Sequence, residues 1–132
     1  MNLRRDVVIL ACAISTGIHG ALAPAHFDEG TGAGVGFVAS TALLAGLVVL
    51  LTLRPADRLP VAGAALVLLG LLVSYALAVT TGFPVLHPEP ESLDGLALAT
   101  KAFEAGGLIA ALGLLHRPAP STSLIHPKGT LT

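Results

Sequence analysis

Four long apolar segments dominate this chain and restrict what it can fold into. They run near residues 6–24, 33–53, 60–81 and 94–116, and each is close to the ~20 residues that an α-helix needs to cross a hydrocarbon core of about 30 Å. Charged residues make up only 11% of the chain, whereas soluble domains carry roughly 25%. The sequence therefore predicts an all-α integral membrane protein, with a four-transmembrane-helix domain over residues 1–116.

Little of the chain is left outside these segments. The tail over residues 117–132 is rich in proline, serine and threonine, a composition that cannot build a hydrophobic core, so we expect it to be flexible. There is no room for a separate soluble domain, and no motif places a nucleophile beside a base. We therefore expect a protein that is not an enzyme and has no nucleic-acid partner.

Loop charges predict the orientation, because short cytoplasmic loops keep Lys and Arg while translocated loops lack them. One set of flanking segments holds the basic residues Arg4, Arg5, Arg54, Arg58, Arg117 and Lys128. The other two loops hold His26, Asp28, Glu29, His87, Glu89, Glu91 and Asp94. We expect an up-down-up-down bundle in a bacterial cytoplasmic membrane, with both termini in the cytoplasm.

The N-terminal segment also fits a cleaved signal peptide, because basic residues and an apolar run precede Ala21-Leu22-Ala23. This run carries Ser15, Thr16 and His19, and its removal would leave an odd number of spans, so we interpret it as a retained helix. Lipidation of Cys12 is another alternative, although the cysteine comes early and more apolar residues follow it.

Polar residues inside the apolar segments are the main functional signal, because an ionisable group in hydrocarbon is costly without a partner or a wet cavity. With a rise of about 1.5 Å per residue, they fall at similar depths in the outer half of the bundle. Lys101 and Glu104 are three residues apart and can form an ion pair on one helix face. The predicted intramembrane cluster is His19, Ser40, Thr41, Tyr75, Lys101 and Glu104.

The inner halves of the segments carry no ionisable side chain, so the pattern predicts a blind polar pocket that opens outward rather than a continuous pore. Ser15, His19 and Glu104 could in principle form a Ser-His-carboxylate assembly, but packing is the simpler interpretation of His19. A haem held by two histidines is not expected, because the segments contain no second deep histidine.

The outer loops offer a candidate metal site. Pro24 is expected to end or kink the first helix before His26, which would leave the next side chains at the mouth of the pocket. Imidazole and carboxylate groups suit copper, zinc or another divalent ion. The predicted ligands are His26, Asp28, Glu29, His87 and Glu89. The alternative is that these residues only anchor the loops at the membrane surface.

The pattern His19, Pro24, His26, Phe27 and Glu29, followed by "TTGFP" after the third segment, resembles small uncharacterised four-helix membrane proteins of bacteria with GC-rich genomes. This resemblance covers most of the chain and implies a fold and a bacterial origin, but no activity.

Two functions therefore stay open. One is a non-enzymatic accessory subunit of a larger membrane complex, or a metal-handling partner that presents the histidine and carboxylate rim. The other is a transporter or sensor of protons or a small solute that uses Lys101 and Glu104 as a buried switch. Self-association is compatible with both, because so small a bundle can enclose a path only with further copies of itself.

Overall fold

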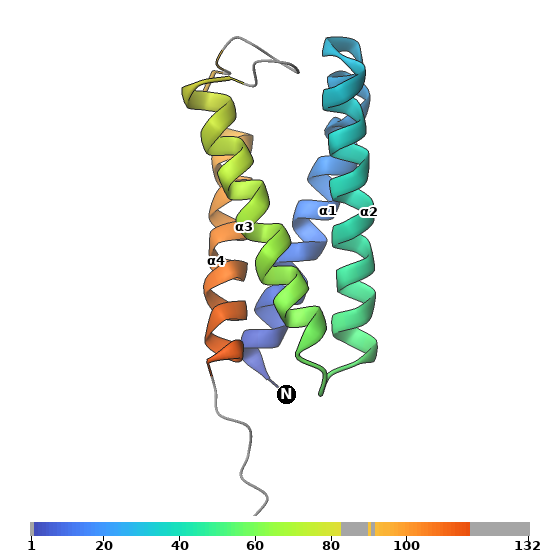
Figure 1. Ribbon diagram of the computed structural model, residues 1–132, viewed down its shortest axis with the longest axis vertical. Helices are drawn as coiled ribbons and strands as arrows, with labels where there is room; N and C mark the ends of the chain where they lie inside the picture. Colours follow the sequence, from blue (N-terminus) through green and yellow to red (C-terminus); the bar gives the residue numbers. More distant parts are fainter. Residues whose placement is uncertain (1, 83–89, 91, 117–132) are drawn as a thin grey trace, which may run out of the picture.

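The computed structural model describes residues 2–82, 90 and 92–116, and this part of the chain folds into four helices (Figure 1). They are α1 (Leu3–Glu29), α2 (Thr31–Leu53), α3 (Leu59–Thr80) and α4 (Gly95–Leu115). All four are long and apolar enough to cross a membrane. The predicted all-α, four-helix architecture of an integral membrane protein is thus confirmed.

Successive helices run in opposite directions, so the start of α1 and the end of α4 lie at the same end of the bundle (Figure 1). α1 packs along both α2 and α4, and α4 also packs on α3, whereas the neighbours α2 and α3 share a much smaller contact. That the shared end faces the cytoplasm stays a prediction. The half of the bundle next to this end is called the inner half below, and the other half the outer half. The tail over residues 117–132 lies outside the described residues.

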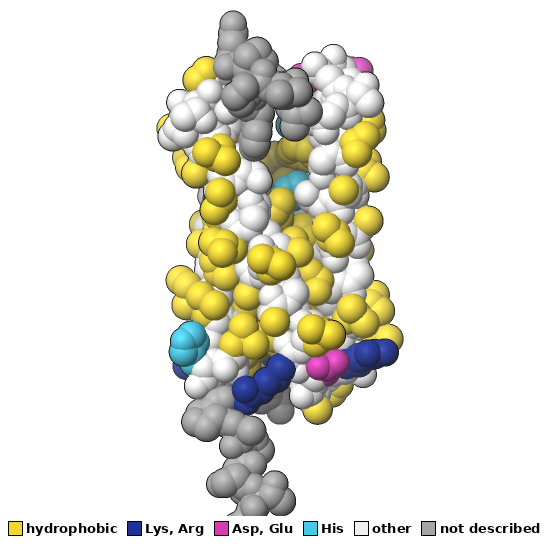
Figure 2. Space-filling view, in the orientation of Figure 1, with side chains coloured by type: hydrophobic (Ala, Val, Ile, Leu, Met, Phe, Trp, Pro, Cys, Tyr) yellow, Lys and Arg dark blue, Asp and Glu magenta, His cyan; other side chains and the backbone are white. Residues whose placement is uncertain are grey.

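The outside of the bundle is apolar. Hydrophobic side chains cover the middle of the face seen in Figure 2, while Lys and Arg side chains gather at the end where α2 ends and α3 begins. Large exposed apolar residues occur on every helix, among them Leu10, Val35, Leu43, Leu66, Val73, Leu98, Phe103 and Ile109. Such a surface suits the acyl chains of a lipid bilayer, which is the environment that the helices indicate.

Pro24 does not end α1 before His26, so this part of the expectation was wrong. The helix continues to Glu29 with Pro24 inside it. Proline removes one backbone donor from a helix, and transmembrane helices tolerate this where neighbouring helices hold the segment in place. The consequence is that His19 and His26 lie on one continuous helix, seven residues apart, and therefore on nearly the same face.

Close packing with α2 holds the last turns of α1 in place. Gly30 alone separates the two helices, and the Phe27 ring lies directly against Gly34. A Cβ atom at position 34 would overlap this ring. The glycine therefore allows α1 and α2 to form a tight hairpin at the outer end of the bundle.

The inner half has an apolar core, and two arginine side chains cover its end. The core cluster includes Val8, Cys12, Leu44, Leu47, Leu51, Val61, Ala64, Leu68 and Ala111. At its end, Arg5 donates hydrogen bonds to the carbonyl oxygens of Leu51 and Arg54, both at 3.1 Å, and Arg4 donates to that of Gly113 at 2.9 Å. These guanidinium groups satisfy carbonyls that the ends of α2 and α4 leave without helical partners.

α1 and α4 lie close together at Gly107. An added Cβ there would lie 2.5 Å from Cβ of Ala11 and 3.1 Å from Cδ1 of Leu68. Since the Cβ of alanine cannot move without its backbone, only glycine allows this helix spacing.

We expect Gly107→Ala to lower the free energy of unfolding by about 1–3 kcal/mol, because the added methyl group must push α1 and α4 apart. Gly106→Ala is the matched control, since a Cβ at the neighbouring position meets nothing within 4 Å. Unfolding of both variants in SDS-containing mixed micelles, followed by circular dichroism, measures the difference. Equal stabilities would contradict the close approach.

Candidate functional site

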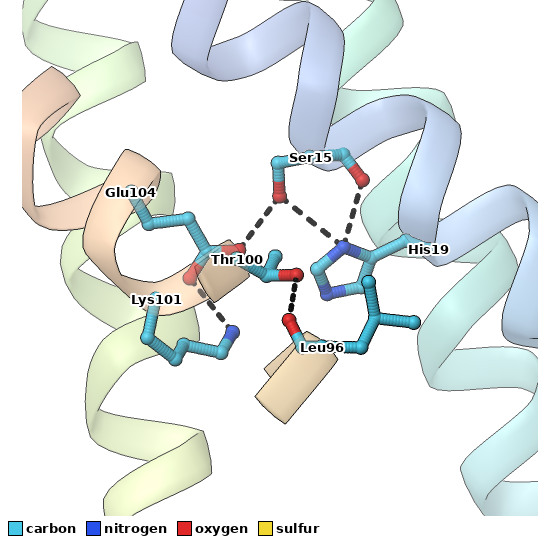
Figure 3. A network of polar contacts seen from close by, with 6 residues as sticks. All are labelled: Ser15, His19, Leu96, Thr100, Lys101 and Glu104. Atoms are coloured by element: carbon cyan, nitrogen blue, oxygen red, sulfur yellow. Dashed lines mark hydrogen bonds and ion pairs between the residues drawn. The ribbon is translucent and has the colours of Figure 1, made fainter. Parts of the chain in front are cut away.

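A buried ion pair lies at mid-height of the bundle. Glu104 and Lys101 both belong to α4, and Nζ of Lys101 donates to Oε2 of Glu104 at 2.7 Å (Figure 3). The side chain of Glu104 is completely buried, whereas that of Lys101 is 15% exposed. A carboxylate at this depth needs such a counter-charge, because the surrounding side chains and lipid solvate it poorly.

Ser15 connects this pair to α1. Its hydroxyl group donates to Oε1 of Glu104 at 2.6 Å, so each carboxylate oxygen accepts one hydrogen bond, from α1 on one side and α4 on the other. Ser15 itself is fully buried. The contact joins two helices through buried charged and hydroxyl groups, and such a hydrogen bond is electrostatically stronger in this apolar surrounding than in water.

His19 extends the chain of hydrogen bonds. Its Nδ1 lies 2.9 Å from the carbonyl oxygen of Ser15 and 3.2 Å from the Ser15 hydroxyl oxygen. Because a carbonyl only accepts, Nδ1 carries the proton, and the hydroxyl proton of Ser15 is already directed to Glu104. Lys101, Glu104, Ser15 and His19 together form the polar network. When His19 is neutral, this arrangement leaves its Nε2 as an acceptor.

This order differs from that of a Ser-His-carboxylate triad, although Ser15, His19 and Glu104 do meet. In a triad the imidazole stands between the hydroxyl and the carboxylate and takes the hydroxyl proton. Here Ser15 stands in the middle and donates directly to Glu104. The arrangement holds a carboxylate in place and does not activate the serine.

A cavity of about 390 Å³ lies above the network in the outer half of the bundle. All four helices line it, with largely apolar side chains and a few polar groups. His19, Thr100 and Lys101 form its deep end, while Ser15 and Glu104 are buried behind them. Pockets of this size with few convergent polar groups are typical of small-ligand sites.

One polar atom beside the cavity has no partner. The hydroxyl oxygen of Tyr75 is buried and makes no hydrogen bond within the described part of the chain. Nζ of Lys101 lies 5.5 Å from the centre of the Tyr75 ring, in cation–π range. Tyr75 and Lys101 thus bring two hydrogen-bond donors to the lining of the cavity.

Phe37 forms an aromatic wall with both histidines of α1. The His26 ring stacks on it at a centroid distance of 3.6 Å and an angle of 22°, and the His19 ring lies 5.1 Å away at 36°. His26 also donates from Nδ1 to the carbonyl oxygen of Leu22 at 2.9 Å. In both histidines, Nδ1 is therefore hydrogen-bonded to a backbone carbonyl oxygen of α1.

Besides Tyr75, two residues of the predicted cluster make no hydrogen bond to the network within the described residues. Ser40 donates its hydroxyl proton to the carbonyl oxygen of Gly36, and Thr41 donates to that of Phe37, each at 2.8 Å. Backbone carbonyls four residues earlier in the same helix are the usual partners for serine and threonine in membrane helices. Depth alone placed these two residues in the cluster, and depth does not determine the direction of a side chain.

Three residues at the site were not in the predicted cluster. Ser15 lies on the same helix stripe as His19, and Thr100 lies four residues from Glu104, so helical spacing could have found both. Phe37 carries no such signal, because an aromatic residue in an apolar segment is as well suited to facing lipid as to lining a cavity.

The predicted metal ligands are only partly within the described residues. Nε2 of His26 lies 4.0 Å from Oε2 of Glu29, and Asp28 is exposed on the same turn. In residues 2–82, 90 and 92–116, no three His, Cys, Asp or Glu side chains gather as a metal site. His87 and Glu89 lie outside this set, so the metal site stays a prediction.

No protein-family model matches the chain, and neither a curated protein nor a solved structure is similar to it. This agrees with the resemblance to small membrane proteins without a functionally named family.

We expect Lys101→Met to lower the free energy of unfolding by about 3–5 kcal/mol, because it leaves the buried carboxylate of Glu104 without its counter-charge. Adding Glu104→Gln should recover most of this loss, since the neutral amide can still accept from Ser15. Unfolding of the single and double variants in mixed micelles tests the pair. If both variants were equally stable, Glu104 would not depend on Lys101.

Proposed function

We propose that the protein is a non-enzymatic integral membrane protein that senses or transports protons or a small solute through its outer pocket. The observation that carries this proposal is the polar network at the deep end of the cavity, which joins α1 to α4. We assign the protein to a bacterial cytoplasmic membrane, with the cavity on the outer side, on the basis of the loop charges and the resemblance to bacterial proteins.

Protonation of Glu104 would change contacts on two helices at once. The neutral acid would no longer hold the Lys101 ammonium group as a counter-charge, and it would no longer attract the Ser15 hydroxyl as strongly. One proton would therefore alter the packing of α1 against α4, which is the kind of two-state element that a switch requires. Lys101 lines the cavity and donates directly to Glu104, so it can pass a proton from the cavity to the carboxylate.

The apolar core of the inner half limits transport by a single copy of the chain. Below Glu104 the side chains that fill the bundle are apolar, and a single bundle in this state offers no polar route to the other side. Sensing needs only the outer pocket and the switch, whereas transport requires that the inner half opens or that several copies enclose a path together. We therefore expect copies of the chain to associate with one another.

In proteoliposomes with an internal pH-sensitive dye, we expect Glu104→Asp to retain proton movement and Glu104→Gln to lose it at least tenfold. The reason is that aspartate keeps a carboxyl group that can bind and release a proton, whereas the amide of glutamine cannot. Size-exclusion chromatography of both variants is the control for assembly. Unchanged proton movement in Glu104→Gln would leave Glu104 with a structural role only.

The second candidate is an accessory subunit of a larger membrane complex, or a partner that handles copper or zinc. It is favoured by His26, whose Nδ1 is held by the Leu22 carbonyl and whose Nε2 lies beside Glu29. Metal-binding histidines commonly donate their second ring nitrogen to a carbonyl in this way.

If the metal interpretation holds, elemental analysis of protein purified in mild detergent should find copper or zinc at about one ion per chain. His26→Ala/His87→Ala should remove it, while His116→Ala, at the opposite end of the bundle, should not. A metal-free preparation that co-purifies with a larger membrane complex would instead support the accessory role.

A further inference from the structure

The cavity has a lateral opening toward the membrane. α2 and α3 make the smallest contact of any neighbouring pair, and a histidine side chain is visible in the hollow between them (Figure 2). The walls on these two helices include small residues such as Gly32, Gly36 and Ala78. Val35 on α2 and Val73 on α3 are exposed, as expected for helix surfaces that face lipid. A ligand can therefore reach the cavity from the bilayer.

The charges around the cavity favour a neutral ligand. Lys101 and Glu104 compensate each other at 2.7 Å. Asp94, at the rim, accepts hydrogen bonds from the backbone N–H groups of Leu96 and Ala97 and so caps α4. A carboxylate or ammonium ligand would have to disturb one of these arrangements, whereas an uncharged molecule would not.

The donor groups favour a ligand that accepts hydrogen bonds. The Tyr75 hydroxyl is buried without a partner in the described residues, and Tyr75 is part of the cavity lining. A ligand that reaches this oxygen would satisfy a donor that is otherwise unpaired. Lys101 donates to Glu104 and has further N–H donors on the same ammonium group. Across from them, the stacked rings of Phe37 and His26 offer a flat wall.

We propose that the cavity binds a neutral, lipid-soluble ring that carries carbonyl oxygens, the chemistry of a quinone head group, and that this ligand enters between α2 and α3. One carbonyl oxygen accepts from Tyr75, with Lys101 beside it as a second donor, and the ring packs against Phe37 and His26. The apolar part of the molecule extends through the lateral opening into the lipid. This inference rests on the proposed function, because it concerns the same pocket. It adds the chemical class of the solute.

The test uses the full chain in lipid nanodiscs with two probes of the same ring size. Menadione carries two carbonyl oxygens, and 2-methylnaphthalene lacks them. Tyr75 is the only tyrosine in the chain, so 3-fluorotyrosine labelling provides a single ¹⁹F resonance at the site. We expect saturable binding of menadione that shifts this resonance, and at least about tenfold weaker binding of 2-methylnaphthalene at equal concentration in the lipid.

Tyr75→Phe removes only the unpartnered hydroxyl group and should weaken menadione binding about fivefold, as measured by calorimetry. Thr52→Val is the matched control, because its hydroxyl bonds within α2 in the inner half and its loss should leave binding unchanged. Equal binding of the two probes, or partitioning without saturation or ¹⁹F shift, would overturn the proposal. So would a Tyr75→Phe variant that binds menadione as tightly as the unchanged protein.

The two proposals fail separately. Proton movement that depends on Glu104 together with absent menadione binding would retain the switch and reject the lipid-soluble ligand. Specific menadione binding together with unchanged proton movement in Glu104→Gln would retain the ligand and reject the switch.

Discussion

The carboxylate of Glu104 is the group on which the rest of the site depends. It is completely buried in a bundle whose surroundings are lipid and apolar side chains, so its charge must be compensated within the protein. Lys101 supplies the counter-charge from the same helix and Ser15 supplies a hydroxyl donor from α1. These two contacts determine which face of α4 turns inward and how α1 lies against it.

The same constraint divides the bundle into two functional halves. Gly107 follows Glu104 by about one helical turn and allows α4 to touch Ala11 of α1, and below it the interior is apolar and closed by arginine side chains. Above Glu104 the helices diverge around a cavity. Tight pairing of α1 with α2 at Gly34 leaves the α2–α3 side as the weaker contact, so the lateral opening is a consequence of where the glycines lie.

The sequence was a good guide where a single helix determines the outcome. The number of helices follows from the apolar segments, and the Lys101–Glu104 contact follows from a spacing of three residues on one helix. It was a poor guide where the outcome depends on packing between two helices. Pro24 lies inside α1 because α2 packs against the next turn, and the hydroxyls of Ser40 and Thr41 bond to their own helix although their depth matches that of the network.

What the sequence by itself determined is the class of the protein, its four spans and the presence of an ion pair in the outer half, because hydrophobic length and local spacing act within one segment. Only the tertiary structure decided that Ser15 links His19 to Glu104, that the Phe37 ring packs against both histidines at the cavity, and that the Tyr75 hydroxyl has no partner in the described residues. These contacts depend on the rotation of each helix about its axis, which is set by close packing at a few glycines and by the need to satisfy one buried charge.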